Sequence, residues 1–261
     1  MIDLRKHLIL LKGLFPFTFV AIIWLVQLAQ GFLQQDWSNY SVHPRHVDGL
    51  IGILIAPLLH AGWAHLLGNT IPLIVLGLLL FASYKEIAGK VFWLIYFLHS
   101  VLVWCFARNG YHLGASGIIY GIASFLFFSG LVRRNPPLTV ISFLVVFIYG
   151  YMAHGIFPFF PEISWEAHLY GALTGLVFAV VLRKEGPQPR KYFVDEEEKE
   201  DHLRVIHSSL AEETQSTQET EATEETQPTQ ETDQPFDQLF PPPVKIHYEW
   251  KEKKKDGEEG E

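Results

Sequence analysis

The chain has 261 residues, of which 49% are hydrophobic, and its formal net charge is −8. Residues 1–184 contain 11 Lys and Arg against 6 Asp and Glu, whereas residues 185–261 contain 9 against 22. The acidic second part cannot bury enough apolar surface to fold alone, so the overall charge says little about the partners of the first part. The single cysteine, Cys105, excludes an intrachain disulfide and a zinc site built on several thiolates.

Uncharged apolar runs predict six helices that cross a bilayer, because a spanning segment in hydrocarbon must satisfy its own backbone groups. The runs cover residues 14–32, 66–84, 91–107, 115–131, 138–157 and 167–182. The first run is long for a signal peptide and no clear cleavage site follows it, so we expect it to be retained. The sequence therefore predicts an all-α polytopic membrane protein, with a six-transmembrane-helix bundle in residues 1–184.

Residues 185–261 are predicted to form a disordered acidic cytoplasmic tail. Charged residues follow the last apolar run, and residues 214–234 are a low-complexity Thr/Gln/Glu segment. A solvated tail is the simplest interpretation, and a cytoplasmic partner for this tail is an open alternative.

The distribution of positive charge predicts the topology. Most Lys and Arg residues of the first part fall on the side that holds the N-terminus, and the opposite loops hold only Arg45 and Arg108. The positive-inside rule then places both termini in the cytoplasm. The long first loop contains an apolar stretch, residues 50–59, that is too short to span. This stretch is expected to lie in the interface or to pack back into the bundle.

Ser116 and His168 lie in the first turns of the fourth and sixth predicted helices. Small residues at spacings of four accompany both: Gly117 and Gly121 on one helix, and Ala167, Gly171 and Gly175 on the other. Such stripes are common packing motifs in membranes. Here they would let the two helices cross near their extracytoplasmic ends and bring Ser116 within hydrogen-bond reach of His168. A neutral imidazole can take the proton of a serine hydroxyl, so the pair indicates acyl-transfer chemistry.

The second predicted helix opens with His60, His65 and Asn69. His65 and Asn69 are four residues apart and share a helical face, so both can donate hydrogen bonds to an oxyanion, together with the Ser116 amide. One alternative is simple interhelical hydrogen bonding. Another is metal binding by His60 and His65, which is disfavoured because no carboxylate or cysteine joins them. No metal and no other cofactor is expected.

Other polar residues receive structural interpretations. His99, His112 and His154 have no partner that the sequence identifies. Glu166 is two residues from His168, but its position diverges around the helix, so we expect it at the water interface rather than in a triad.

The three motifs together resemble those of rhomboid intramembrane serine proteases. They are His65-x-x-x-Asn69, Gly114-x-Ser116-Gly117 and Ala167-His168-x-x-Gly171, and the resemblance covers about residues 14–183. It implies Ser116 as nucleophile and His168 as general base and acid. It implies His65, Asn69 and the Ser116 amide as the oxyanion hole.

The resemblance also implies supporting roles and a substrate class. Tyr120 would pack against the His168 ring, and Gly171 would be the close crossing point. The fifth helix and residues 157–165 would act as gate and cap. Expected partners are transmembrane protein substrates and the lipid bilayer, and no nucleic acid.

One feature departs from the family pattern. Many members carry a Trp-Arg pair in the first loop, at positions that are Ile51 and Gly52 here. The serine and the histidine that inactive relatives typically lose are both present. Two other functions remain open: a non-catalytic adaptor that binds transmembrane segments, and a transporter. The transporter is disfavoured because no inverted repeat or intramembrane carboxylate is present.

Overall fold

The structure is a computed structural model that describes residues 4–160, 162–189, 200–201, 203–212 and 214, with side chains from residue 13 onward. Contacts divide the chain into two compact units, Met1–Tyr192 and Phe193–Glu261. The α-helices of the first unit are α1 (Leu4–Leu33), α2 (Gly52–Ile55), α3 (Trp63–Ser83), α4 (Ala88–Phe106), α5 (Ser116–Arg133), α6 (Pro136–Tyr149) and α7 (Trp165–Val181). A 3-10 helix, η4 (Gly150–Ile156), follows α6.

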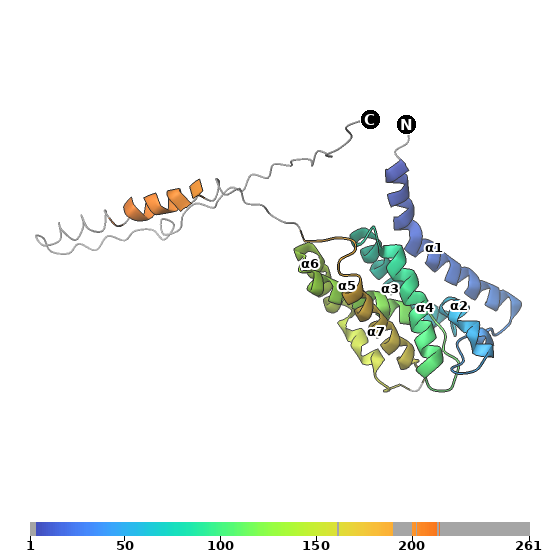
Figure 1. Cartoon of the computed structure of the whole chain (residues 1–261). Coiled ribbons are helices and arrows are strands. Elements are labelled where there is room, and N and C mark those ends of the chain that lie inside the picture. The colour runs from blue at the N-terminus through green and yellow to red at the C-terminus, as the bar shows by residue number, and fades with distance from the viewer. Residues whose placement is uncertain (1–3, 161, 190–199, 202, 213, 215–261) are drawn as a thin grey trace, which may run out of the picture. The chain divides into compact units, whose positions relative to one another are not determined.

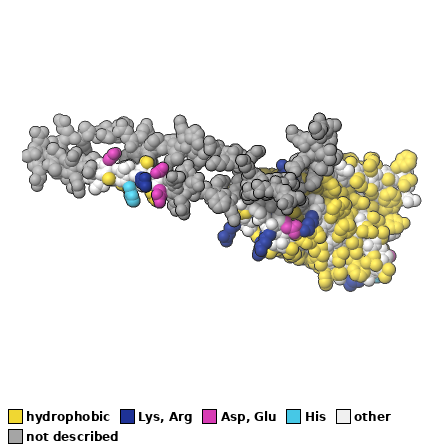
Figure 2. Space-filling view, turned by 45° about the horizontal axis from the view of Figure 1, so that its top comes forward, with side chains coloured by type: hydrophobic (Ala, Val, Ile, Leu, Met, Phe, Trp, Pro, Cys, Tyr) yellow, Lys and Arg dark blue, Asp and Glu magenta, His cyan; other side chains and the backbone are white. Residues whose placement is uncertain are grey.

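The predicted all-α membrane bundle is confirmed, although the helices differ in length from the predicted runs. Within the described residues, five helical segments are long and apolar enough to cross a membrane: Gly13–Leu33, Trp63–Ser83, Ala88–Phe106, Ser116–Arg133 and Pro136–Ile156. The sixth predicted span is α7, which is apolar but has only 17 residues. Figure 2 shows hydrophobic side chains covering much of the surface of this helical unit. On α6, Phe147 is 89% exposed, as expected for a side chain that faces lipid.

Helix α5 lies at the centre of the bundle and contacts α3, α4, α6 and α7 (Figure 1). Its apolar side chains Ile118, Ile122, Phe125 and Leu126 are at most 1% exposed. These side chains join one continuous core with residues of α1, α3, α4 and α6. The central helix therefore fixes where its first residue, Ser116, lies relative to every neighbouring helix.

Glycine allows α5 and α7 to approach until their backbones touch. A Cβ atom built on Gly171 would collide with the carbonyl oxygen of Gly117, and one on Gly175 would collide with that of Gly121. On the other helix, a Cβ atom on Gly117 would lie 3.1 Å from the carbonyl oxygen of Ala167. Only residues without a side chain permit such an approach, which is how small-residue stripes join membrane helices.

The first loop packs back into the bundle through its apolar stretch. Ala56 and Pro57 are buried, and the Ala56 carbonyl accepts a hydrogen bond of 3.0 Å from the Gly114 amide. Gly52 lies so close to the backbone of Ser41 and Val42 that a Cβ atom would not fit. This close packing occupies the place where many relatives carry the arginine of the Trp-Arg pair.

Residues directly after α7 are held by the buried Arg133 guanidinium. Arg133 donates to the carbonyl oxygens of Leu182 and Glu185 at 2.6 Å each and to that of Pro187 at 3.1 Å. Asn135 donates to the Gln188 carbonyl at 3.0 Å. Residues 185–188 therefore pack on the helical unit, although the sequence assigned them to the tail.

A second difference concerns residues 200–214, which are helical wherever they are described. The sequence placed them in a disordered tail because they are charged and precede a low-complexity segment. Arg204 lies 3.9 Å from Glu200 one turn away, a pairing that favours a helix locally. Most of the remaining predicted tail, including its low-complexity segment, lies outside the described residues.

The α5–α7 crossing predicts a selective sensitivity to a single methyl group. Replacing Gly171 with Ala should destabilise the protein by about 1–3 kcal/mol, because the backbones must separate. Gly89→Ala is the matched control, since a Cβ atom there meets nothing within 4 Å. Thermal unfolding of both variants in detergent measures the difference. Equal melting temperatures would contradict the close backbone contact.

Candidate active site

Ser116 is the first residue of α5, and a glycine turn presents it. Gly114 adopts φ = +108°, a conformation that side chains disfavour. A Cβ atom at Gly114 would also lie 2.6 Å from Cε1 of His65. Position 114 therefore requires glycine for two reasons: its backbone conformation and its close contact with the His65 ring.

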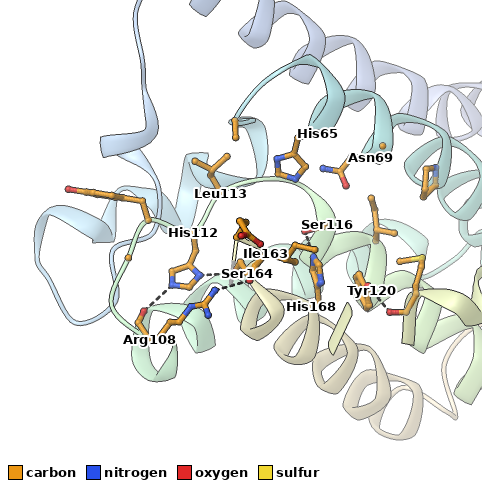
Figure 3. A pocket seen from close by; sticks show the side chains of 18 of the residues that line it. His65, Asn69, Arg108, His112, Leu113, Ser116, Tyr120, Ile163, Ser164 and His168 are labelled. Carbon is orange, nitrogen blue, oxygen red and sulfur yellow. Dashed lines mark hydrogen bonds between the residues drawn. The ribbon is translucent and has the colours of Figure 1, made fainter. Parts of the chain in front are cut away.

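The close helix crossing brings the serine and the histidine together (Figure 3). The Ser116 hydroxyl lies 2.8 Å from Nε2 of His168, although 52 residues separate them. Nδ1 of His168 lies 2.9 Å from the carbonyl oxygen of Gly155. A carbonyl only accepts hydrogen bonds, so Nδ1 carries the proton and Nε2 is free to accept the serine hydroxyl. This is the tautomer that a general base requires.

Tyr120 holds the other side of the histidine. Its ring stacks on the His168 ring with a centroid distance of 4.2 Å and an interplanar angle of 8°. Its hydroxyl donates a 2.7 Å hydrogen bond to the Met152 carbonyl oxygen. Met152 and Gly155 both belong to η4, so this short helix orients the base directly and also through Tyr120.

His65 and Asn69 project from α3 toward the turn that carries Ser116, as Figure 3 shows. Asn69 is 5% exposed, and its Nδ2 atom makes no hydrogen bond within the described protein. A buried donor without a partner is costly unless a ligand or water supplies the acceptor. The Ser116 amide at the N-terminus of α5 adds a further donor, whereas the amides of Ile118 and Ile119 already donate to the Ala115 carbonyl oxygen.

These side chains line one pocket of about 710 Å³. Among the lining residues are Ser116 and His168, Tyr120, His65, Asn69 and Arg108. The structure thus brings together the predicted nucleophile, base and oxyanion donors, with polar groups on both sides of the serine hydroxyl. The pocket is large enough to admit a short stretch of peptide.

Glu166 lies elsewhere than the sequence predicted. It is only 2% exposed rather than at the water interface, and its carboxylate lies 3.3 Å from Nε of Arg108. Arg108 belongs to the loop before Ser116 and also donates to the Ile163 carbonyl at 2.8 Å. This ion pair has no signature in the sequence, because Arg108 is 58 residues away in an irregular loop.

His112 also has partners that the sequence did not identify. Its Nδ1 lies 2.5 Å from the Ser164 hydroxyl, and its Nε2 lies 3.0 Å from the Arg108 carbonyl oxygen. Burial lowers the pKa of His112, so the ring is neutral at pH 7. Together with the pair between Arg108 and Glu166, these contacts join the loop before α5 to the segment that enters α7.

The other histidines lie around the site rather than in it. Nδ1 of His99 donates a 2.7 Å hydrogen bond to the Ile95 carbonyl oxygen, and the ring packs on Gly117 behind the serine. A carbonyl partner makes this Nδ1 the donor. His154 is exposed and contacts the Tyr151 carbonyl at 3.1 Å. Both rings therefore have backbone partners in the structure.

His60 is 3% exposed, and neither ring nitrogen has a hydrogen-bond partner within the described protein. Its ring faces that of His65 at a centroid distance of 5.1 Å. Burial and the neighbouring His65 lower the pKa of His60 to about 4. His60 borders a second pocket, beside Gln27 and Gln30 of α1.

Three features of the site were not predicted from the sequence. They are the roles of the Met152 and Gly155 carbonyl oxygens as acceptors and the positive φ of Gly114. Backbone carbonyls have no signature in a sequence, since every residue has one. For Gly114, the glycine itself was the only available signal.

Comparison with known proteins agrees with the motifs. The Rhomboid domain family matches residues 47–185. The chain is 37% identical over 179 residues to an uncharacterized protein of Mycobacterium tuberculosis, an alignment that covers 63% of this chain and 72% of that protein.

Two relatives carry the family in their names. RHOMBOID-like protein 4 of Arabidopsis thaliana is 29% identical over 129 residues, which cover 48% of this chain and 32% of that protein. Rhomboid-related protein 1 of Caenorhabditis elegans is 31% identical over 134 residues, which cover 48% of this chain and 37% of that protein. Since the family match spans more than half of the chain and the bundle contains several apolar helices, this integral membrane protein belongs to the rhomboid family.

Proposed function

We propose that the protein is an intramembrane serine endopeptidase that cleaves transmembrane segments of other membrane proteins. The observation that carries this proposal is the 2.8 Å contact between the Ser116 hydroxyl and Nε2 of His168. The Gly155 carbonyl supports it by holding the histidine in the tautomer of a general base. A packing role alone would not require this proton arrangement.

The chemistry follows that of other serine hydrolases. Oγ of Ser116 attacks the carbonyl carbon of the scissile peptide bond while Nε2 of His168 takes the hydroxyl proton. The resulting imidazolium gives that proton to the leaving amine, and an acyl-enzyme on Ser116 remains. Water, activated by the same nitrogen, then hydrolyses the ester and restores the serine.

The Gly155 carbonyl takes the place that a carboxylate occupies in a triad. A neutral carbonyl stabilises an imidazolium less than an anion does, because it contributes a dipole rather than a full charge. It nevertheless fixes the ring through Nδ1, and Tyr120 fixes it from the face. Orientation of the base therefore depends on η4 rather than on an acidic residue.

Asn69, His65 and the amide of Ser116 would stabilise the oxyanion. Asn69 is the strongest candidate among the side chains, since its Nδ2 is buried and has no hydrogen-bond partner among the described residues. A donor that is already desolvated loses no water when negative charge develops on the substrate oxygen.

The topology is part of the proposal. Both termini lie in the cytoplasm, and the pocket opens toward the extracytoplasmic side, where Ser116 and His168 begin their helices. Helix α6 exposes Val140, Phe143 and Phe147 along its length. A transmembrane substrate would approach this apolar face from the bilayer and unfold locally to reach Ser116.

Ser116→Ala and His168→Ala should each abolish labelling by a fluorophosphonate probe and cleavage of a transmembrane reporter, because each removes one half of the proton transfer. Ser124→Ala is the matched control on the same helix, since the Ser124 hydroxyl only donates to the Ala172 carbonyl. Labelling and cleavage would be compared among proteins purified in detergent, and equal melting temperatures would show that each variant is folded. Full cleavage by a folded Ser116→Ala protein would overturn the proposal.

Absence of labelling in the folded parent, with an active relative labelled in parallel, would favour a non-catalytic adaptor.

Asn69→Ala should lower kcat by about 100-fold with little change in KM, since its amide acts on the oxyanion and not on the ground-state substrate. Thr70→Ala is the control, because Thr70 is the next residue of α3 and instead contacts Trp24 at 3.1 Å. Steady-state kinetics on the reporter measures both. An unchanged kcat in Asn69→Ala would remove this residue from the oxyanion hole.

A further inference from the structure

The loop between α1 and α3 gathers three side chains of the types that bind metal ions. His43, His46 and Asp48 each offer a ligand atom, and these atoms all lie within 4.8 Å of one another. His43 is half-buried, whereas His46 and Asp48 are exposed. No part of the proposed proteolytic chemistry uses this cluster.

The hydrogen bonds of His43 leave an electrostatic conflict that a cation would relieve. Nε2 of His43 lies 3.0 Å from the Asn109 side-chain oxygen, so Nε2 must carry the ring proton. In the neutral ring, Nδ1 then carries a lone pair, and it points at the Asp48 carboxylate 3.3 Å away. Two acceptors facing each other repel, unless a proton or a metal ion lies between them.

The same arrangement is typical of metal-binding histidines. A ligating imidazole usually donates its second N–H to a carbonyl or carboxylate oxygen, which fixes the tautomer and the ring orientation. Asn109 supplies that acceptor here. His43 is therefore presented with its metal-binding nitrogen toward the carboxylate and its other nitrogen already used.

His46 supplies a second imidazole beside the first. The two rings stack with a centroid distance of 3.8 Å and an interplanar angle of 5°. Two imidazoles and one carboxylate favour Zn²⁺ over Mg²⁺ or Ca²⁺, which prefer oxygen ligands. Two rings in parallel planes cannot both point a lone pair at one ion, so the exposed His46 side chain must rotate out of this stack to bind. The exposed Asp48 side chain can then move until the ligand atoms are about 3.4 Å apart, as tetrahedral zinc requires.

The backbone around the cluster is held firmly. The His46 carbonyl accepts a 2.9 Å hydrogen bond from the Trp104 indole, and the Arg45 amide donates to the Trp104 carbonyl at 2.9 Å. Gly49 packs against the backbone of His43 so closely that a Cβ atom would not fit. The ligand positions are thus set by the fold rather than by a loose loop.

We propose that His43, His46 and Asp48 form a Zn²⁺ site that clamps the first loop to the loop before α5. Asn109 belongs to that second loop, and residues Val42 and His112 pair their backbones across the same two loops. Three protein ligands leave a coordination position open to water. None of the three ligands lines the pocket that contains Ser116, although Asn109 does.

Calorimetric titration of ZnCl₂ into the metal-stripped full-length protein, purified in detergent without a histidine tag, tests the site. The parent should bind one equivalent of Zn²⁺, and His46→Ala should weaken that binding at least tenfold. His207→Ala, which changes an exposed histidine of the second unit, is the matched control and should bind like the parent. CaCl₂ should give no saturable binding.

A second readout separates a clamp from adventitious histidine binding. Saturating Zn²⁺ should raise the melting temperature of the parent and of His207→Ala, but not that of His46→Ala or Asp48→Asn. Because His46 and Asp48 are exposed, both variants should fold without metal. Equal Zn²⁺ affinity in His46→Ala and His207→Ala, or no binding by the parent, would overturn the proposal. Cleavage activity enters neither readout, so the result does not depend on the proposed protease function.

Discussion

The α5 and α7 backbones touch where these helices carry Ser116 and His168. Gly171 lies against the carbonyl oxygen of Gly117. Gly117 directly follows Ser116, and Gly171 is three residues after His168. In hydrocarbon there is little hydrophobic force between helices, so packing at short range must hold them together. The same glycines that provide this packing also set the distance between serine and histidine. Stability of the bundle and geometry of the dyad therefore share one physical cause.

In this tightly packed region, backbone carbonyls rather than side chains accept the hydrogen bonds of His168 and Tyr120. Gly155 accepts from His168, and Met152 accepts from Tyr120. A Cβ atom on Gly155 would collide with the Tyr120 hydroxyl. Residue 155 must therefore be glycine for η4 to lie this close to Tyr120. A carbonyl dipole held in place by η4 requires no buried carboxylate, which would be costly inside a membrane.

The sequence predicted the helices and the approach of Ser116 to His168 from patterns along single helices. Apolar runs define the spans, and glycines at spacings of four show which faces of α5 and α7 meet. It failed where the decisive contact joins irregular segments far apart in the chain. The neighbours of Glu166 in its helix suggested exposure, but Arg108 arrives from a loop 58 residues earlier and buries it. The sequence identified no partner for His112 for the same reason, since its Nδ1 contacts the hydroxyl of Ser164, 52 residues away.

The first loop illustrates how one family architecture tolerates different local solutions. Where many relatives carry a Trp-Arg pair, this chain has Ile51 and Gly52, and Gly52 packs directly on the backbone of residues 41 and 42. An arginine there would displace that backbone and, with it, the pairing of Val42 with His112. His112 in turn contacts Ser164, at the entrance to α7. The close approach at Gly52 therefore helps to hold the outer loops against the helix that carries His168.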